Sequence, residues 1–508
     1  MRTIRSLINY GVSFAVDHFV MILGILATPY LIRYLGHESF GVVQVIKEWT
    51  AFLVILQMGT EGSLLVLMVK YYGEEKIEDL AKAVSIGVRV YFYVMGISLV
   101  GLGIFVYFAP HIINHSKVLA QDISFGTLFA GLSCLFLPFK AYILLLQAEQ
   151  RTYLVQLISL LQSVLIIVLS VLFSWLSWGV TGYFIATFIG SAAYHLAGTL
   201  LSYRRNRSLP VTLFSPVEKT MMGKLLKFNK SIFLSDLAGR FGLMADNIIL
   251  SFFLGPKIVV AFYSTQRLLQ IGGNQLTNIA NATWASLGDL YARQKYERFN
   301  EILLEISHLI VILSIGLYAI LGFFNFSFIK IWLGPEFYAG DLLTSVVAVN
   351  FALLPLQSFW GWCFVTSGTV TITYPYTILK AVINIIFSLY LTSSGIMEGP
   401  VIGTCISFLT IGVFITPWLL KKIFGIPLRK IIMIFVKPIG MGIVFATLVY
   451  SYHKNYPPEG WIGLMMSMFL FGISYLVLSW IFLLTSFQKI LWIQRLTNIR
   501  NKLRGNSG

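Results

Sequence analysis

The sequence predicts an all-α polytopic membrane protein of about 14 transmembrane helices, arranged as two parallel six-helix lobes plus two C-terminal helices. The chain is 57% hydrophobic, and its mean hydropathy is +0.80. Only 11% of its 508 residues are charged, whereas soluble globular chains average about 25%. Apolar runs of about 20 residues, the length that one helix needs to cross the hydrocarbon layer, recur along the chain. These observations exclude a water-soluble multi-domain enzyme and a disordered scaffold.

The apolar runs locate each expected span, and an even number of crossings places both chain ends on one side of the membrane. The spans lie near 10–33, 41–69, 84–108, 124–148, 152–174, 179–201, 229–254, 258–287, 302–329, 341–362, 374–394, 399–420, 431–451 and 461–484. The eighth span has a face too polar for contact with lipid, formed by Gln270, Asn274, Gln275, Asn278 and Asn281.

Lysine and arginine counts in the loops predict the orientation, because cytoplasmic loops carry an excess of these residues. The segments on the side of the amino terminus hold 24 of them, and the opposite loops hold 5. We therefore expect an inner-membrane protein with both termini in the cytoplasm. The net charge of +16 fits this bias and anionic lipid headgroups, so nucleic acid is not an expected partner.

A weak internal repeat predicts the domain organisation. Sliding the chain by 219 residues aligns the first span with the seventh, through the pairs Phe14/Phe233, Asp17/Asp236 and Leu35-Gly36/Leu254-Gly255. Parallel repeats of this kind are common in secondary transporters, although chance similarity remains an alternative. We expect an N-terminal six-helix lobe (1–203), a basic cytoplasmic linker (204–228), a C-terminal six-helix lobe (229–421), and two extra helices with a basic cytoplasmic tail (422–508).

No loop exceeds about 30 residues, so the loops leave no room for a soluble nucleotide-binding domain, and no Walker-type glycine-rich motif is present. The three cysteines, Cys134, Cys363 and Cys405, lie in apolar stretches and have neither a disulfide framework nor metal-ligand spacing. We therefore expect no cofactor, no metal site and no ATP-driven step within this chain.

Ionisable side chains inside the spans are the candidate functional residues, because a charge at mid-bilayer costs several kcal/mol and faces a cavity or a partner. In the seventh span, Asp236, Arg240 and Asp246 share one helix face at about 100° per residue. Asp236 and Arg240 are four residues apart and can also simply neutralise each other.

The intramembrane cations outnumber the acids, which favours an anionic substrate, since Arg and Lys are natural partners of phosphate oxygens. A carboxylate beside a cation can titrate or coordinate an ion, so the acids are candidates for coupling to H⁺ or Na⁺. The substrate-binding candidates are Arg240, Arg267, Lys47, Lys140 and Lys380. The ion-coupling candidates are Asp17, Asp236, Asp246 and Glu61, and Glu48 is a further acid within a span.

Four stretches resemble one family. They are LGHESFGVVQV (35–45), DNIILSFFLGPKIVVAFYSTQRL (246–268), WLGPEFYAG (332–340) and AVINIIFSLYLTSSGIMEGPVIGT (381–404). Their order and spacing are similar to those of the oligosaccharide and polysaccharide flippases (Wzx-like). This family belongs to the MOP superfamily, which also contains the MATE exporters and the lipid II flippase.

The resemblance implies a MATE-like, V-shaped pair of six-helix lobes that work by alternating access. The implied substrate is a polyprenyl-diphosphate-linked oligosaccharide, moved to the outer leaflet for a surface polymer such as the O-antigen of lipopolysaccharide. Membrane lipids and other polysaccharide assembly proteins are the implied partners. The five cations named above would hold the diphosphate. Thr60-Glu61 departs from the family pattern, which has an apolar residue there, and this leaves the role of Glu61 open.

Two alternatives remain. A MATE-like ion-coupled drug antiporter predicts a lumen dominated by acids, and the cations outnumber the acids here. A membrane-embedded polysaccharide polymerase or glycosyltransferase needs an outer loop with catalytic residues. The longest outer loop, 109–123, carries no paired carboxylates, so we expect no enzyme activity.

Overall fold

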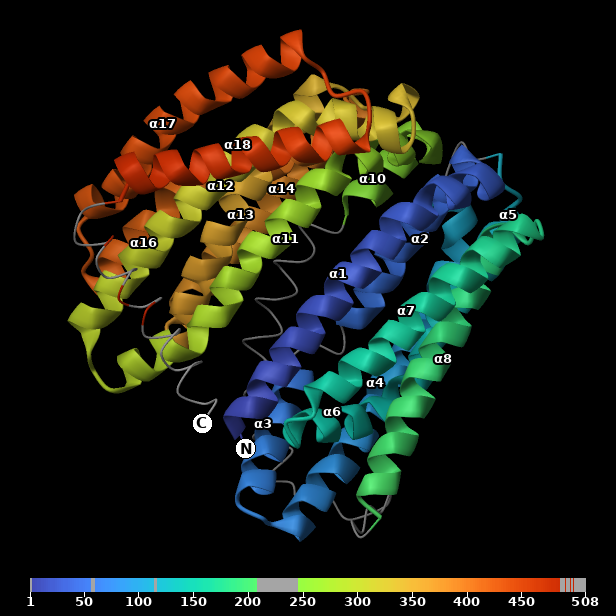
Figure 1. Cartoon of the computed structure of the whole chain (residues 1–508). Helices are drawn as coiled ribbons and strands as arrows, with labels where there is room; N and C mark the ends of the chain where they lie inside the picture. Colours follow the sequence, from blue (N-terminus) through green and yellow to red (C-terminus); the bar gives the residue numbers. More distant parts are fainter. Residues whose placement is uncertain are drawn as a thin grey trace. The chain divides into compact units, whose positions relative to one another are not determined.

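The computed structural model describes residues 2–55, 60–113, 117–207 and 245–484, together with the single positions 489, 494 and 497. Within these residues every regular element is a helix (Figure 1). The predicted all-α fold class is therefore confirmed. The helices fall into two compact units. Unit 1 comprises Met1–Val260 with Ala381–Pro400, and unit 2 comprises Ala261–Lys380 with Val401–Gly508.

The first part of the chain supplies most of unit 1. Its helices are α1 (Arg2–Leu35), α2 (His37–Ile55), α3 (Thr60–Gly73), α4 (Ile77–Ile112), α5 (Ala120–Leu132), the 3₁₀ segment η1 (Ser133–Phe139), α6 (Lys140–Ala148), α7 (Thr152–Trp175), α8 (Gly179–Arg205) and α10 (Asp246–Leu254). In Figure 1 these helices run from blue to green, with α1, α7 and α8 side by side.

The later helices supply most of unit 2. They are α11 (Pro256–Ala292), α12 (Tyr296–Trp332), the short 3₁₀ turn η2 (Pro335–Phe337), α13 (Asp341–Thr366), α14 (Val370–Ser393), α15 (Gly399–Ser407), the π-helix η3 (Phe408–Ile415), α16 (Thr416–Phe424), α17 (Leu428–Asn455) and α18 (Trp461–Phe482). The division between the units falls within α14, after Lys380.

Eleven helical stretches in the described residues are long and apolar enough to cross a membrane. Two further expected spans, α2 and α11, are long helices that fall outside this set. α2 carries Glu38, Lys47 and Glu48 within its 19 residues, and α11 carries the polar face predicted from the sequence. The seventh expected span, 229–254, is described only from residue 245 onward. Both α2 and α11 hold candidate functional residues, Lys47 on α2 and Arg267 on α11.

The expected linker, 204–228, and the expected start of the second lobe lie almost entirely outside the described residues. The four-part division of the chain therefore stays a prediction. The described contacts group residues 381–400 with the N-terminal helices.

The core of unit 1 is formed where α3, α4, η1 and α6 pack together. Leu64, Met68, Tyr91 and Leu144 are buried in it with almost no exposed surface. Helices in lipid gain little from the hydrophobic effect and associate through close packing, for which small residues are suited. Gly87 provides such a contact, because its Cα faces Ala141 and Leu64.

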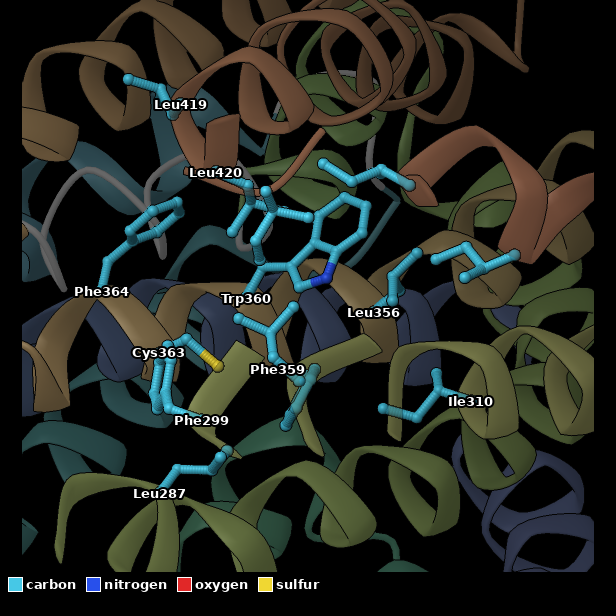
Figure 2. Packing of buried hydrophobic residues seen from close by; sticks show 14 of the residues in the cluster. Leu287, Phe299, Ile310, Leu356, Phe359, Trp360, Cys363, Phe364, Leu419 and Leu420 are labelled. Atoms are coloured by element: carbon cyan, nitrogen blue, oxygen red, sulfur yellow. The ribbon is translucent and has the colours of Figure 1, made fainter. Parts of the chain in front are cut away.

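The core of unit 2 surrounds Trp360 of α13, which lies in the middle of the cluster shown in Figure 2. Its apolar neighbours come from α12, α13 and α16, and include Phe359 and Leu420. The Trp360 indole Nε1 donates a hydrogen bond of 2.9 Å to the Ser307 hydroxyl. The indole therefore satisfies its polar atom inside an apolar environment, as a buried tryptophan needs to do. This core holds α13, and with it Gln357, in a fixed position.

Candidate functional site

The two Leu-Gly turns of the predicted repeat both contain a glycine with a positive φ. Gly36, between α1 and α2, has a φ of +82°, and Gly255, between α10 and α11, has a φ of +88°. Both angles lie in the left-handed region that favours glycine. Both turns line one pocket of about 620 Å³, together with Lys117 and Lys257. The repeat stays a prediction, because Phe233 and Asp236, which form its other pairs, lie outside the described residues.

Next to this pocket, α2 and the start of α11 approach each other closely. Gly41 packs directly on the backbone carbonyl of Pro256, and a Cβ at Gly41 would overlap that oxygen. A backbone contact of this kind depends on the missing side chain. The FG pair of the LGHESFGVVQV stretch thus has a packing role within unit 1.

About two helical turns further along α2 from Gly41, Glu48 binds the first turn of α10. Its carboxylate accepts hydrogen bonds from the Asn247 backbone nitrogen at 3.0 Å and from the Asn247 side-chain nitrogen at 2.5 Å. The first-turn N–H groups of a helix lack partners within the helix and favour negative charge. Glu48 supplies this cap from another helix, because Ala245, at the N-cap of α10, has no side-chain cap.

Asp246, an ion-coupling candidate, is the first residue of α10 and directly precedes Asn247, which Glu48 binds. Two acidic side chains from different helices therefore lie together in unit 1. Such a pair favours binding of a cation or sharing of a proton, since two nearby carboxylates resist simultaneous ionisation. Glu48 is an acid within an expected span, but Asn247, to which it binds, lies 199 residues away in the chain, and no sequence motif connects the two.

Glu61 and Lys140 form an ion pair in unit 1. The Lys140 Nζ lies 2.5 Å from the Glu61 Oε2, and the two side chains are 21% and 43% exposed. Lys140 begins α6, directly after the 3₁₀ segment that contains Pro138. The sequence assigned these residues to different roles, the cation to the substrate and the acid to an ion. The structure instead pairs them, so each compensates the charge of the other.

The other two candidates of unit 1 are placed on α1 and α2. Asp17 is exposed on α1. Lys47 is exposed on α2, with its Nζ 4.8 Å from the centre of the Tyr183 ring. A cation over an aromatic face is stabilised while it keeps its charge. Asp236 and Arg240 lie outside the described residues, so their shared helix face stays a prediction.

The two candidates of unit 2, Arg267 and Lys380, are held by neutral groups. Arg267 of α11 donates a hydrogen bond of 3.3 Å to the Gln270 side-chain oxygen and lies 5.9 Å from the centre of the Tyr263 ring. Lys380 of α14 donates a hydrogen bond of 3.2 Å to the Gln357 side-chain oxygen. In the described part of the chain, neither cation forms an ion pair with a carboxylate.

The predicted polar face of α11 is present in unit 2. Asn274, Gln275, Asn278 and Asn281 are exposed on it, and Asn281 accepts a hydrogen bond of 2.9 Å from the Trp362 indole. Amides on such a face offer donors and acceptors suited to sugar hydroxyls. Arg267 precedes these residues on the same helix, so α11 combines a guanidinium with a row of amides.

The WLGPEFYAG stretch has a structural role at the turn between α12 and α13. Asn325 of α12 donates hydrogen bonds to the Thr265 carbonyl at 2.9 Å and to the Thr344 hydroxyl at 3.1 Å. The Ala339 backbone nitrogen donates one of 2.9 Å to the Thr265 hydroxyl. These bonds fasten the turn to α11, the helix that carries Arg267.

These features define the class of protein to which the chain belongs. The chain is a multi-pass membrane protein with the fold of MOP-superfamily transporters. It is similar to the lipid II flippase MurJ in an inward closed conformation, with a TM-score of 0.70 and 16% identity over 92% of this chain and 98% of that one. It is also similar to an inward-facing multidrug resistance MATE family transporter of the MOP superfamily, with a TM-score of 0.62 and 17% identity over 88% of this chain and 99% of that one.

A third similar structure is a MOP superfamily transporter from Pyrococcus furiosus, described as having a binding pocket of reverse polarity. It matches with a TM-score of 0.57 and 18% identity, over 89% of this chain and 96% of that one. A search of curated protein sequences found no significant match. The family model described as polysaccharide biosynthesis protein matches residues 6–285. The chain therefore belongs to this family. The family is one of polysaccharide transporters and flippases, and the fold agrees with this.

Proposed function

We propose that this protein is a flippase for polyprenyl-diphosphate-linked oligosaccharides. It moves each finished unit from the cytoplasmic to the outer leaflet of the inner membrane by alternating access, for the assembly of a cell-surface polysaccharide such as the O-antigen of lipopolysaccharide. The substrate enters from the cytoplasm, where both termini lie. The protein forms no covalent intermediate and acts as a transporter, not as an enzyme.

The observation that carries this proposal is that the described partners of Arg267 and Lys380 are neutral. Arg267 and Lys380 both lie within expected spans, on α11 and α14, and their described partners are amide oxygens and aromatic rings. A charge inside a membrane is costly and is expected to have a function. Because neutral partners leave the positive charge uncompensated, these residues are suited to an anionic substrate. Arg267 is the best candidate for the diphosphate, since a guanidinium can grip phosphate oxygens with two parallel hydrogen bonds.

Lys47 provides a further cation for the diphosphate on α2, and Arg240 is a further candidate on the predicted seventh span. Lys140 has a different role in this proposal, because Glu61 compensates its charge. Protonation of Glu61 would break the ion pair and leave the ammonium able to attract the substrate. The pair would then couple ion uptake to substrate binding.

Asp246 and Glu48 form the second proposed coupling site. A proton or a sodium ion between the two carboxylates would relieve their repulsion. Neutralising Glu48 would also weaken its bonds to Asn247, and thereby loosen α2 from α10. Glu48 would in this way couple ion binding to helix movement. Asp17 and Asp236 remain candidates for ion coupling, and the proposal assigns neither of them a partner residue.

The proposal is tested in cells that lack this gene and keep the rest of its pathway. Polyprenyl-diphosphate-linked oligosaccharides are extracted, and a membrane-impermeant sugar-oxidising reagent applied to spheroplasts reports which leaflet holds them. We expect completed units to accumulate in the cytoplasmic leaflet, and the wild-type gene to reverse this. Incomplete units, or completed units in the outer leaflet, would instead indicate an enzyme that acts before or after translocation.

A matched pair of variants connects this phenotype to the site. Arg267→Ala should fail to reverse the accumulation although the protein is inserted normally. Lys437→Met, which removes a cation from α17 outside the proposed site, should reverse it as the wild type does. Normal export by a correctly inserted Arg267→Ala protein would remove Arg267 from the site.

A further inference from the structure

A polar cluster inside unit 2 lies where α13, α14 and the π-helix η3 meet. Lys380 of α14 donates to the Gln357 Oε1 at 3.2 Å, and its Nζ lies 4.9 Å from the centre of the Phe408 ring. Phe408 is the first residue of η3. π-helical turns are rare and occur frequently at functional sites. The cluster therefore combines a membrane-embedded cation with an unusual backbone element.

The Gln357 amide has an unused donor. An ammonium group can only donate hydrogen bonds, so the amide oxygen must face Lys380 and the amide nitrogen must point elsewhere. The Gln357 Nε2 is buried and has no hydrogen-bond partner within the described structure. Leaving a buried donor without a partner is unfavourable. This cost is expected to be recovered when a ligand supplies an acceptor.

The amide is also held in place. Gly412 of η3 packs directly on the Gln357 side chain, and a Cβ at Gly412 would overlap its Nε2. The residue before Gln357, Leu356, belongs to the buried core around Trp360 (Figure 2). The Gln357 amide is thus held by η3 on one side and by the core around Trp360 on the other. A specific binding site requires such preorganisation.

We infer that Lys380 and Gln357 form a subsite for a carboxylate, and that the oligosaccharide moved by this protein carries an acidic sugar such as a uronic acid. The inference rests on the proposed flippase function. A carboxylate has two oxygens in one plane, which can accept one hydrogen bond from the ammonium and one from the amide. A diphosphate carries more charge and more oxygens than one ammonium and one amide can satisfy. This chemistry differs from the one proposed at Arg267, where a guanidinium would hold the diphosphate.

This subsite would select the sugar. A neutral sugar in the same position leaves the ammonium without a counter-charge and brings no charged acceptor to the amide. Sites built to hydrogen-bond one group reject analogues that lack it. We expect at least a tenfold preference for the acidic substrate.

The first test is binding to the purified full-length protein in lipid nanodiscs. The probes are glucuronate, glucose and inorganic pyrophosphate, and tryptophan fluorescence reports binding. Glucuronate should bind at least tenfold more tightly than glucose, and Lys380→Met and Gln357→Leu should each abolish this difference. Lys437→Met is the matched control and should retain it. Equal binding of glucuronate and glucose to the wild type would overturn the inference. A loss of pyrophosphate binding in Lys380→Met without a loss of glucuronate binding would place Lys380 in the diphosphate site instead.

The second test separates this inference from the proposed function. Two host strains that lack their own flippase make repeat units that differ only in one sugar, a uronic acid or its neutral parent. The wild type should export the acidic unit at least tenfold better, and Gln357→Glu, which gives Lys380 an internal counter-charge, should lower the acidic-to-neutral ratio. Equal export of both units would overturn the acidic-sugar inference and leave the flippase function intact. Export of neither unit would overturn both.

Discussion

The Glu48 carboxylate on α2 binds both the backbone nitrogen and the side-chain nitrogen of Asn247 on α10. The two residues lie 199 positions apart in the chain. One carboxylate thereby caps a helix, fixes a polar side chain and lies beside Asp246. The relationship connects the stability of unit 1 with a candidate ion site, and it leads to the first prediction.

Glu48→Ala should lower the free energy of unfolding of the protein by about 1–3 kcal/mol, because it leaves the partly buried N–H groups of Asn247 without this partner. Thermal unfolding in detergent measures the change. The control is Asp289→Ala, which removes a partner of the exposed Arg293 and should have almost no effect, as exposed ion pairs contribute little. An equal, small effect of both substitutions would argue against the cap.

Reversing the Glu61–Lys140 ion pair should preserve transport better than breaking it. Glu61→Gln removes the counter-charge of Lys140 inside the membrane, so we expect export to fall at least tenfold. The double variant Glu61→Lys with Lys140→Glu restores opposite charges at the same contact, and should recover most of the loss. Radiolabelled sugar incorporated into surface polymer measures both effects. If the swapped pair is as inactive as the single variant, the identity of each residue matters more than their pairing.

Gly316→Ala should destabilise unit 2 by about 1–3 kcal/mol, because a Cβ there would overlap the Tyr475 ring. Tyr475 cannot easily move, since its hydroxyl donates a hydrogen bond of 2.9 Å to the Ile312 carbonyl. Gly440→Ala on α17 is the matched control, because a Cβ there meets no atom within 4 Å. The control should be neutral or slightly stabilising in a helix. A tolerated Gly316→Ala would show that α12 and α18 pack less closely than described.

Arg267→Lys should retain only part of the transport activity. An ammonium keeps the charge but cannot form two parallel hydrogen bonds to a diphosphate. We expect the apparent affinity for substrate to fall more than the maximal rate, and initial rates at several substrate concentrations separate the two. Full activity of Arg267→Lys together with no activity of Arg267→Ala would mean that charge alone suffices.

Much of the fold could be predicted from the sequence, because a membrane helix is defined by a local property of about 20 residues. The apolar runs at 302–329 and 431–451 correspond to α12 and α17. The two long helices outside the apolar set, α2 and α11, carry charged or amide side chains within their expected spans. Local sequence therefore indicated where spans lie and which of them carry polar groups.

The partners in the candidate sites could not be predicted, because they depend on tertiary packing. Lys140 was recognised as an intramembrane cation, but its partner Glu61 lies 79 positions away. Gln357 gave no signal, since a single glutamine in an apolar helix has no periodicity or motif. The π-helix η3 leaves no clear trace in the sequence either, although it sets the surroundings of Lys380.

The most direct test of the proposed function uses the purified full-length protein in liposomes that contain a fluorescent polyprenyl-diphosphate-linked oligosaccharide. A membrane-impermeant quencher reports how fast the labelled headgroup crosses the bilayer. We predict rapid crossing with the wild-type protein and with Lys437→Met, and crossing at the protein-free rate with Arg267→Ala. Crossing that stays at the protein-free rate with folded wild-type protein, with and without a proton or sodium gradient, would contradict the flippase function.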